Sequence, residues 1–428
     1  MSTCMSLYER EPRKLHHAGP GPAAQNLRSA AALTIIEVMT NTLPPLEKMI
    51  RDLVAIPSVS SVQPQLDTGN LPVCELLAEW ADALGFSTTL MPVPGQEGKY
   101  NFIARLGSGE GGLVLSGHTD TVPWDEGRWS RDPFDASIRD GRIYGLGTAD
   151  MKSFLAVALL AASQFRASGL KAPLTILGTA DEESTMSGAR ALVETGGPLG
   201  RFAVIGEPTD LRPINAHKGI VMEGIRLIGQ SGHSSNPALG NSALEGMLRV
   251  AEILRQLRSE FARDYRAVDF AVPEPTINLG YIRGGDSANR ICGRCDMHID
   301  VRLNPGMTVK SVRSAIRESI RGGLKGSGLE IEFDALFEGV DPLAPGPLDR
   351  LVRFCEEETG LERGAVCFGT EGPFLQGLGM ETVIMGPGSI DQAHQPDEFL
   401  ELSSASRAVD LVGRLIHRFC RDPAEERQ

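Results

Sequence analysis

The sequence lacks any long uninterrupted apolar run, and it has fewer basic than acidic side chains. No apolar run in its 428 residues reaches the roughly 18–20 residues that a helix needs to span a bilayer. Lys and Arg number 42 against 55 Asp and Glu, which gives a formal net charge of -13. A protein that binds nucleic acids in general carries a basic surface. We therefore expect neither a membrane nor a nucleic acid as a partner.

Cysteine is scarce, and its spacing forms no framework. The seven cysteines are an odd number with no pattern typical of disulfides, so a reducing cytoplasm is the simpler interpretation. Cys292 and Cys295 have the spacing of half a zinc knuckle, but no second Cys-x-x-Cys follows. The pair lies in a strand-like segment, where positions i and i+3 point to opposite faces. We interpret the cysteines as structural and expect a cytoplasmic protein.

The N-terminal 38 residues carry no clear structural signal. The apolar stretch at 30–39 is short, contains Glu37 and lacks a small-residue cleavage site, so it is not typical of a signal peptide. A Gly/Pro-rich segment at 19–22 favours disorder. We predict a disordered N-terminal extension over residues 1–38. Met39, just before the first predicted helix, is an alternative to Met1 as the initiator.

Helix and strand patterns alternate from residue 46 to about residue 214 and again after residue 343. The apolar strands predicted in the first part are 102–106, 112–116, 174–179 and 202–205. Continuous apolar strands that alternate with helices predict an α/β domain with a mainly parallel sheet, buried on both faces. We expect this domain to comprise residues 39–214 and 337–428.

The middle of the chain has a different pattern. Its predicted elements are a strand at 220–228, a helix at 242–261, strands at 276–282 and 297–303, a helix at 309–320 and a strand at 329–335. The order βαββαβ predicts a ferredoxin-like α+β unit. About 120 residues suffice for a separate domain. We therefore expect an inserted domain over residues 215–336.

His118 and Asp120 follow a predicted strand, and ligands collect at the C-terminal ends of strands in an open α/β sheet. The Asp120 carboxylate would then accept an imidazole N–H of His118 and fix its tautomer. An ordinary turn is the alternative for this pair. Asp150 lies just before the helix predicted at 152–165, where an N-cap is the alternative to a metal ligand.

Three further carboxylates and a second histidine follow strand ends. Glu182 and Glu183 are adjacent, and because neighbouring side chains diverge, one can bind a metal while the other moves protons. Glu207 ends the next predicted strand, and His394 lies in a Gly/Pro-rich loop after the last one. Imidazole and carboxylate ligands without a thiolate favour a hydrolytic Zn²⁺ site. The number of ligands exceeds what one ion needs, which indicates two metals with a bridging carboxylate.

Seven stretches of the chain resemble the acetylornithine deacetylases, a group of the di-zinc metallohydrolases that also include succinyl-diaminopimelate desuccinylases, aminoacylases and glutamate carboxypeptidases. The stretches are 116–123 (SGHTDTVP), 144–152 (YGLGTADMK), 179–183 (TADEE), 205–209 (IGEPT), 229–235 (GQSGHSS), 288–292 (ANRIC) and 386–398 (GPGSIDQAHQPDE). The resemblance extends from about residue 40 to the C-terminus. Its first two motifs and its last are long and specific.

The resemblance implies a role for each residue of the cluster. The implied ligands are His118, Asp150 and Glu207 for one Zn²⁺, and Asp150, Glu183 and His394 for the other. Co²⁺ is the expected substitute for Zn²⁺. Glu182 would be the general base, and Asp120 would support the ligands from the next layer. A cis peptide bond between Asp150 and Met151 is also implied.

The resemblance further implies that the inserted domain is a lid and a dimerisation module, so we expect a homodimer through residues 215–336. His233 would reach the partner subunit's active site and stabilise the oxyanion; a loop histidine is the alternative. Asn289 and Arg290 follow a Gly-Gly-Asp turn, and an Arg fork suits a substrate carboxylate, with a surface charge as the alternative. Glu371 is a candidate contact for a cationic substrate side chain.

Together these roles predict hydrolysis of N2-acetyl-L-ornithine to L-ornithine and acetate in arginine biosynthesis. The metal site acts only on the amide, so other substrates of such enzymes stay open. These are acetylcitrulline, succinyl-diaminopimelate, other N-acyl amino acids, and the peptides cleaved by dipeptidases and carboxypeptidases. A non-catalytic binding or scaffolding homologue is the alternative from another class. A missing base or ligand would support it, and no such position is missing.

Overall fold

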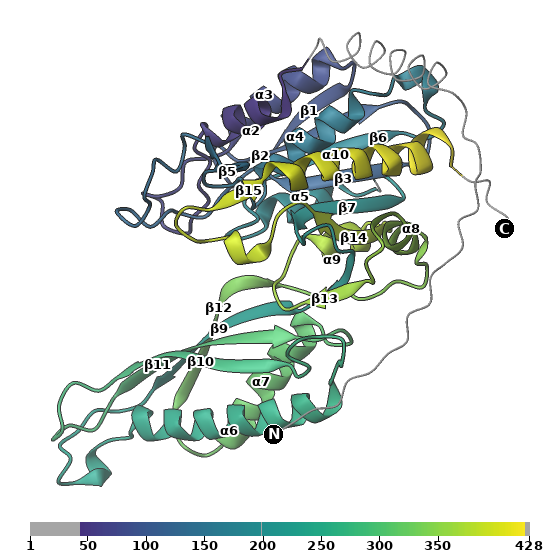
Figure 1. The fold of residues 1–428 in the computed structure, drawn as a ribbon. Coiled ribbons are helices and arrows are strands. Elements are labelled where there is room, and N and C mark those ends of the chain that lie inside the picture. Colours follow the sequence, from purple (N-terminus) through teal and green to yellow (C-terminus); the bar gives the residue numbers. More distant parts are fainter. Residues whose placement is uncertain (1–42, 198, 424–428) are drawn as a thin grey trace, which may run out of the picture. The chain divides into compact units, whose positions relative to one another are not determined.

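The structure is a computed structural model that describes residues 43–197 and 199–423 (Figure 1). The predicted disordered extension over residues 1–38, and Met39 as an alternative initiator, lie outside the described residues.

Eight strands form one mixed sheet. In sheet order they are β1 (Ser87–Pro92), β2 (Tyr100–Leu106), β6 (Leu174–Thr179), β3 (Leu113–His118), β7 (Phe202–Pro208), β14 (Glu381–Gly386), β8 (Ile214–His217) and β13 (Gly364–Val366). The central pairs β6–β3, β3–β7 and β7–β14 are parallel, whereas β1–β2, β2–β6 and β14–β8 are antiparallel. The predicted fold class, α/β with a mainly parallel central sheet, is confirmed.

Helices cover both faces of this sheet. They are α2 (Leu46–Val54), α3 (Leu71–Ala83), α4 (Lys152–Ala162), α5 (Ser187–Thr195), α8 (Arg350–Thr359), α9 (Gly372–Gly377) and α10 (Leu402–Ile416). Leu113 and Leu115 of β3 pack into the same core as α2, α3, α4 and α10, whereas Val114 packs with residues of α5 and α9. Because successive side chains of a strand point to opposite faces, β3 must be apolar at each of these positions.

A small antiparallel sheet is built from short strands that precede Asp150 and follow His394 in the sequence. Its strands are β15 (Phe399–Glu401), β5 (Arg142–Tyr144) and β4 (Ser137–Arg139). Phe399 pairs with Tyr144, and Glu401 pairs with Arg142. The segment after His394 is thereby joined to the segment before Asp150.

The middle of the chain forms a four-stranded antiparallel sheet with two helices. In chain order its elements are β9 (Gly219–Ile228), α6 (Ala243–Asp264), β10 (Thr276–Gly284), β11 (Arg294–Leu303), α7 (Val309–Gly323) and β12 (Glu330–Val340). The sheet order is β10-β11-β9-β12, and the unit has its own core. Ser242 caps α6, and Thr308 forms a capping box at α7, which explains why both helices begin there. The elements follow the βαββαβ order, while the domain limits 215 and 336 stay a prediction.

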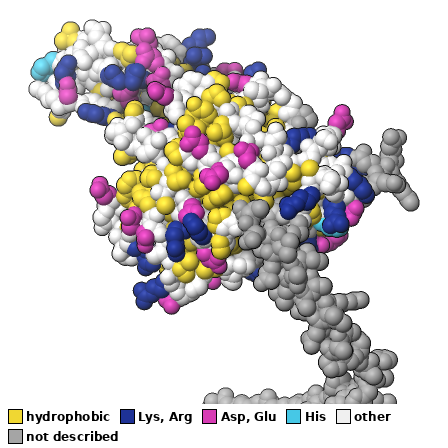
Figure 2. All heavy atoms as spheres, turned by 90° about the horizontal axis from the view of Figure 1, so that it is seen from above, with side chains coloured by type: hydrophobic (Ala, Val, Ile, Leu, Met, Phe, Trp, Pro, Cys, Tyr) yellow, Lys and Arg dark blue, Asp and Glu magenta, His cyan; other side chains and the backbone are white. Residues whose placement is uncertain are grey.

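In the part of the chain that the structure describes, no helix is both long and apolar enough to cross a membrane. The described cysteines, Cys74, Cys292, Cys295, Cys355, Cys367 and Cys420, are all free thiols. On the face drawn in Figure 2, acidic and basic side chains are interspersed among apolar ones and neither sign forms a continuous field.

Candidate metal centre

The central strands bring the candidate residues to one edge of the sheet. His118 is the last residue of β3, Glu207 lies near the end of β7, and Glu182 and Glu183 follow β6. His394 comes after β14, the next strand of the sheet. Because β6, β3, β7 and β14 run parallel as neighbours, their C-terminal ends meet at the same edge.

Asp150 lies between the two histidines. Its Oδ1 is 2.9 Å from Nε2 of His118, and its Oδ2 is 3.6 Å from Nε2 of His394. On the His394 side, Glu183 places both carboxylate oxygens within 3.0–3.1 Å of the same Nε2. On the His118 side, Oε1 of Glu207 lies 4.0 Å from Nε2 of the imidazole. The structure therefore brings all five predicted ligands together, with one oxygen of Asp150 toward each half.

The cluster concentrates buried negative charge. Burial raises the pKa of Glu183 and, with it, the pKa of Glu207, and the charge of Asp150 raises both further. Burial by itself would lower the pKa of His118, but the hydrogen bond to Asp150 and the charges of Asp150, Glu207 and Asp120 together outweigh burial and raise that pKa. The hydrogen bond to Glu183 raises the pKa of His394 to about 9. Carboxylates packed this closely away from water repel one another unless cations neutralise them.

The donor set fits two divalent ions. The ligand atoms of His118, Asp150 and Glu183 lie within 4.8 Å of one another, so the two halves of the cluster are close enough to share Asp150. Imidazole and carboxylate donors without a thiolate suit Zn²⁺ or Co²⁺, whereas Mg²⁺ and Ca²⁺ prefer oxygen donors alone. Asp150, with its two oxygens toward different histidines, has the placement that a bridging ligand needs.

The helix after Asp150 rules out the capping alternative for this residue. Helix α4 begins at Lys152, its N-cap position is Met151, and no side chain caps it. The Asp150–Met151 peptide bond is cis, as predicted.

Asp120 acts through different atoms than predicted. Nδ1 of His118 donates to the backbone carbonyl of Asp120 at 3.0 Å, whereas the carboxylate lies 3.8 Å away. The carboxylate instead accepts the backbone N–H groups of Glu182 at 3.2 Å and Glu183 at 3.1 Å. The Asp120 carbonyl thus contacts the ring, while its carboxylate reaches the loop after the neighbouring strand β6. The predicted tautomer, with Nε2 free to bind a metal, therefore comes from the main chain.

Glu182 and Glu183 have different surroundings. Both oxygens of Glu183 contact His394, whereas the Glu182 carboxylate has no hydrogen-bond partner among residues 43–197 and 199–423. Burial raises the pKa of Glu182 well above its usual value, and the charges of Glu207 and Glu183 add to this. A carboxylate of high proton affinity without a fixed partner is suited to proton transfer.

Glu371 lies beside the cluster and is buried. Oγ1 of Thr179, the last residue of β6, donates to its Oε2 at 2.8 Å, while its Oε1 has no hydrogen-bond partner among the described residues. Burial raises the pKa of Glu371 to about 7. The predicted contact to a cationic substrate group therefore starts from a carboxyl group with one unsatisfied oxygen.

The predicted lid residues form a second, exposed group. His233 and Arg290 form an isolated antiparallel β-bridge, and Ser234 N–H donates to the carbonyl of Asn289 at 3.0 Å. Nη1 of Arg290 lies 2.6 Å from Oδ2 of Asp286, so part of its fork is engaged locally. The structure brings these three residues together in the inserted domain.

Two carboxylates of the site were missed in the sequence. Asp181 has a left-handed backbone with φ of 65°, and its carboxylate accepts hydroxyl groups of Ser60, Ser184, Thr185 and Ser187. Glu398 is buried and accepts backbone N–H groups of the loop before Asp150. Both acids belong to motifs that also contain predicted ligands, and an acidic residue inside such a motif was the only available signal.

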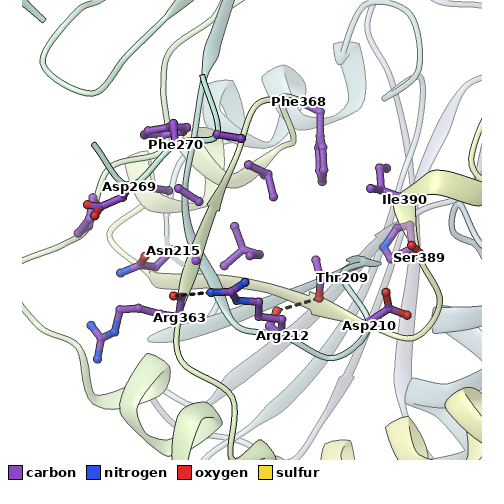
Figure 3. A pocket seen from close by; sticks show the side chains of 18 residues that line it. Thr209, Asp210, Arg212, Asn215, Asp269, Phe270, Arg363, Phe368, Ser389 and Ile390 are labelled. Carbon is purple, nitrogen blue, oxygen red and sulfur yellow. Dashed lines mark hydrogen bonds between the residues drawn. The ribbon is translucent and has the colours of Figure 1, made fainter. Parts of the chain in front are cut away.

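A cavity of about 860 Å³ adjoins the segments that carry two of the candidate ligands (Figure 3). Thr209, two residues after Glu207, and Ser389 and Ile390, in the loop before His394, line it. The charged residues that line it are Asp210, Asp269, Arg212 and Arg363. Because both signs are present, the charge of this cavity does not select one substrate class.

Comparison with known proteins identifies the family. Residues 114–418 match the model of the peptidase family M20/M25/M40, which is more than half of the chain. The chain belongs to this family. It is therefore a metal-dependent hydrolase.

Solved structures of M20 proteins share its fold. Aminopeptidase PepT from Bacillus cereus is 20% identical, with a TM-score of 0.67 over 87% of this chain and 97% of that chain. The metallo-carboxypeptidase Sso-CP2 from Sulfolobus solfataricus is 18% identical, with a TM-score of 0.66 over 87% and 99%. The YXEP protein of Bacillus subtilis, a dinuclear metal-binding peptidase, is 16% identical, with a TM-score of 0.60 over 87% and 96%.

Proposed function

We propose that this M20 hydrolase is a zinc-dependent deacetylase of the cytoplasm that converts N2-acetyl-L-ornithine to L-ornithine and acetate in arginine biosynthesis. The observation that carries the chemistry is the placement of Asp150 between His118 and His394, next to a Glu182 carboxylate that has no fixed partner among the described residues. The choice of acetylornithine rests on the motifs that resemble acetylornithine deacetylases.

The residues that would hold the metals follow from the contacts. His118 and Glu207 would complete one site and Glu183 and His394 the other, with Asp150 shared by both. Two bound Zn²⁺ ions would lower the pKa of a water toward neutrality and polarise the amide carbonyl. The backbone carbonyl of Asp120 holds the proton of His118 on Nδ1 and so keeps Nε2 available.

Glu182 would carry the proton. Its carboxylate takes a proton from the attacking water, the new C–O bond forms at the acetyl carbon, and the C–N bond breaks. The same carboxyl group then gives that proton to the leaving α-amine. The Asp120 carboxylate holds the backbone of Glu182 and Glu183, so base and ligand keep a fixed spacing.

The lid residues would bind the parts of the substrate away from the metals. Nδ1 of His233 accepts the N–H of Ser235 at 3.2 Å, so a neutral imidazole carries its proton on Nε2. That N–H would donate to the developing oxyanion. Arg290 and Asn289, in the adjacent loop, would bind the α-carboxylate, and Glu371 would face the amino group of the ornithine side chain.

A homodimer through the inserted domain is part of this proposal, because His233 would act across it. Strand β10 is an edge of its sheet and exposes Leu279, Tyr281 and Ile282. Helix α6 exposes Leu244 and Leu248. An edge strand with exposed apolar side chains is a surface for pairing with a second copy. Light scattering should find a dimer that Ile282→Lys weakens.

Substrate preference tests the specific assignment. We expect kcat/KM of the zinc-loaded enzyme to be highest for acetylornithine among acetylornithine, acetylcitrulline, acetylmethionine, succinyl-diaminopimelate and a dipeptide. A higher value for any of the others would replace the substrate but leave the hydrolase in place. A dipeptide as best substrate would agree with the structural similarity to aminopeptidase PepT and to the metallo-carboxypeptidase Sso-CP2.

A further inference from the structure

Glu398 joins the two chain segments that carry Asp150 and His394. It is only 2% exposed, and its carboxylate accepts three backbone N–H groups. Its Oε1 accepts from Ala149 at 2.7 Å and from Asp150 at 3.1 Å, and its Oε2 accepts from Gly147 at 3.2 Å. Its own backbone carbonyl accepts the N–H of Gly145 at 2.9 Å. One residue thus holds the main chain of 145–150 at four points.

The loop over residues 145–150 belongs to no helix or strand. It leaves strand β5 after Tyr144 and reaches helix α4 at Lys152, with Asp150 between them. Residues 145–150 are buried, and a buried backbone N–H needs an acceptor. The Glu398 carboxylate supplies the acceptor for three of them, including the N–H of Asp150 itself.

Neighbouring acids of the same segment serve other contacts. Oδ1 of Asp397 accepts the N–H of Ser130, in a different loop. Glu401 is exposed and pairs with Arg142, at the outer end of the β15–β5 pairing. Only Glu398, among the described acids of 394–401, bonds to the backbone of Asp150.

We propose that Glu398 is a positioning residue that holds Asp150 between the two metal positions and thereby sets the affinity of the centre for its metal pair. The inference rests on the metal centre of the proposed function but not on its substrate. Since Asp150 is the proposed shared ligand, a displacement of its loop weakens both sites together. Loss of an outer contact to a metal centre typically reduces affinity about 10–100-fold.

Glu398→Gln is the sharpest variant. The Gln carbonyl can still accept from Ala149 and Asp150, but its NH₂ group then faces the N–H of Gly147, so one bond of three becomes a contact between two donors. Glu398→Ala removes all three bonds. Glu401→Gln is the matched control, because the same change of side chain removes the charge of a surface ion pair between the adjoining strands β15 and β5.

The test measures Zn²⁺ affinity by competition with a chromophoric chelator, independently of activity. We expect the dissociation constants of both Zn²⁺ ions to rise about 10-fold or more in Glu398→Gln and further in Glu398→Ala, with Glu401→Gln unchanged. Folded Glu398→Gln protein with wild-type affinity would overturn the proposal. So would an equal loss of affinity in Glu401→Gln.

Hydrogen exchange of the wild-type protein tests the same contacts without a variant. In the metal-free protein, the amides of Gly147, Ala149 and Asp150 should be protected. Exchange of these amides as in an open loop would also overturn the proposal. If the wild-type protein binds no Zn²⁺, the proposal of a metal centre is itself wrong. If it binds two Zn²⁺ but does not hydrolyse acetylornithine, only the proposed substrate is wrong. The Zn²⁺ affinities of the variants would then still test the role of Glu398.

Discussion

Replacing Glu182 with Gln changes the charge of one side chain and almost nothing of its size. Within the described residues the Glu182 carboxylate accepts no hydrogen bond, so the substitution breaks no contact of the folded protein. Its backbone N–H remains bonded to Asp120 at 3.2 Å, which keeps the main chain of the loop in place. The variant therefore isolates the proton-transfer role of this position.

The expected loss is that of a general base. Removing such a group lowers turnover by about 10²–10⁴-fold, or about 3–5 kcal/mol of transition-state stabilisation. Zinc content and KM should stay near wild type, because the five proposed ligands are untouched. The metal-free variant should also melt higher than metal-free wild type at pH 8. Burial and the neighbouring carboxylates raise the pKa of Glu182, so its charge destabilises the folded state there and Gln removes that charge.

Glu183→Gln is the matched neighbour. Both oxygens of Glu183 lie within 3.0–3.1 Å of His394, so this variant should lose Zn²⁺ affinity at least about 10-fold. Metal analysis, steady-state kinetics and melting curves of both variants form the assay. The reasoning is refuted if fully zinc-loaded Glu182→Gln turns over within about tenfold of wild type, where no base is lost. It also fails if the two variants lose metal equally.

Three further changes probe the site and the fold around it. His217 donates from Nδ1 to a backbone carbonyl, and burial lowers its pKa to about 4. As the pH falls, this histidine is therefore protonated in the unfolded chain before it is protonated in the folded protein, which lowers the free energy of unfolding. Between pH 7.5 and pH 5, urea unfolding should show that wild type loses about 2 kcal/mol more of this free energy than His217→Asn. Equal losses would contradict this. The Asp120 carboxylate accepts two backbone N–H groups, and Asp120→Asn replaces one of its two oxygens by an NH₂ donor. We expect kcat to fall about 10–100-fold with little change in the melting temperature. A melting temperature that falls in step with kcat would indicate a purely structural role. A Cβ at Gly206 would lie 1.9–2.3 Å from ring atoms of Phe154, so Gly206→Ala should destabilise the protein by about 1–3 kcal/mol in thermal unfolding. Adding Phe154→Leu to this variant should recover part of the lost stability. If the losses of the two substitutions are simply additive, the predicted clash is wrong.

The sequence predicted the elements that bury continuous apolar surface. Strands β3, β6 and β7 are buried at every residue, and the prediction found each of them. Strand β1 was missed because it is an edge strand with mostly polar or exposed positions. Strands β4, β5 and β15 were missed because three residues carry too little pattern, although they hold the Asp150 loop to the His394 segment.

The candidate residues could be found from the chain because their types, and their places after strand ends, are local properties. Two histidines and a set of carboxylates at strand ends already indicated a hydrolytic metal site, and the motifs indicated the family. The role of each of these residues depends on which of their atoms are in contact. That the Asp120 carbonyl rather than its carboxylate meets His118, and that Glu398 meets the N–H of Asp150, follows from the path of the main chain across neighbouring strands. Sequence alone determined which groups this protein has for its chemistry, and only the tertiary structure decided which of them hold the others in place, because hydrogen bonds between distant segments leave no periodic trace in the chain.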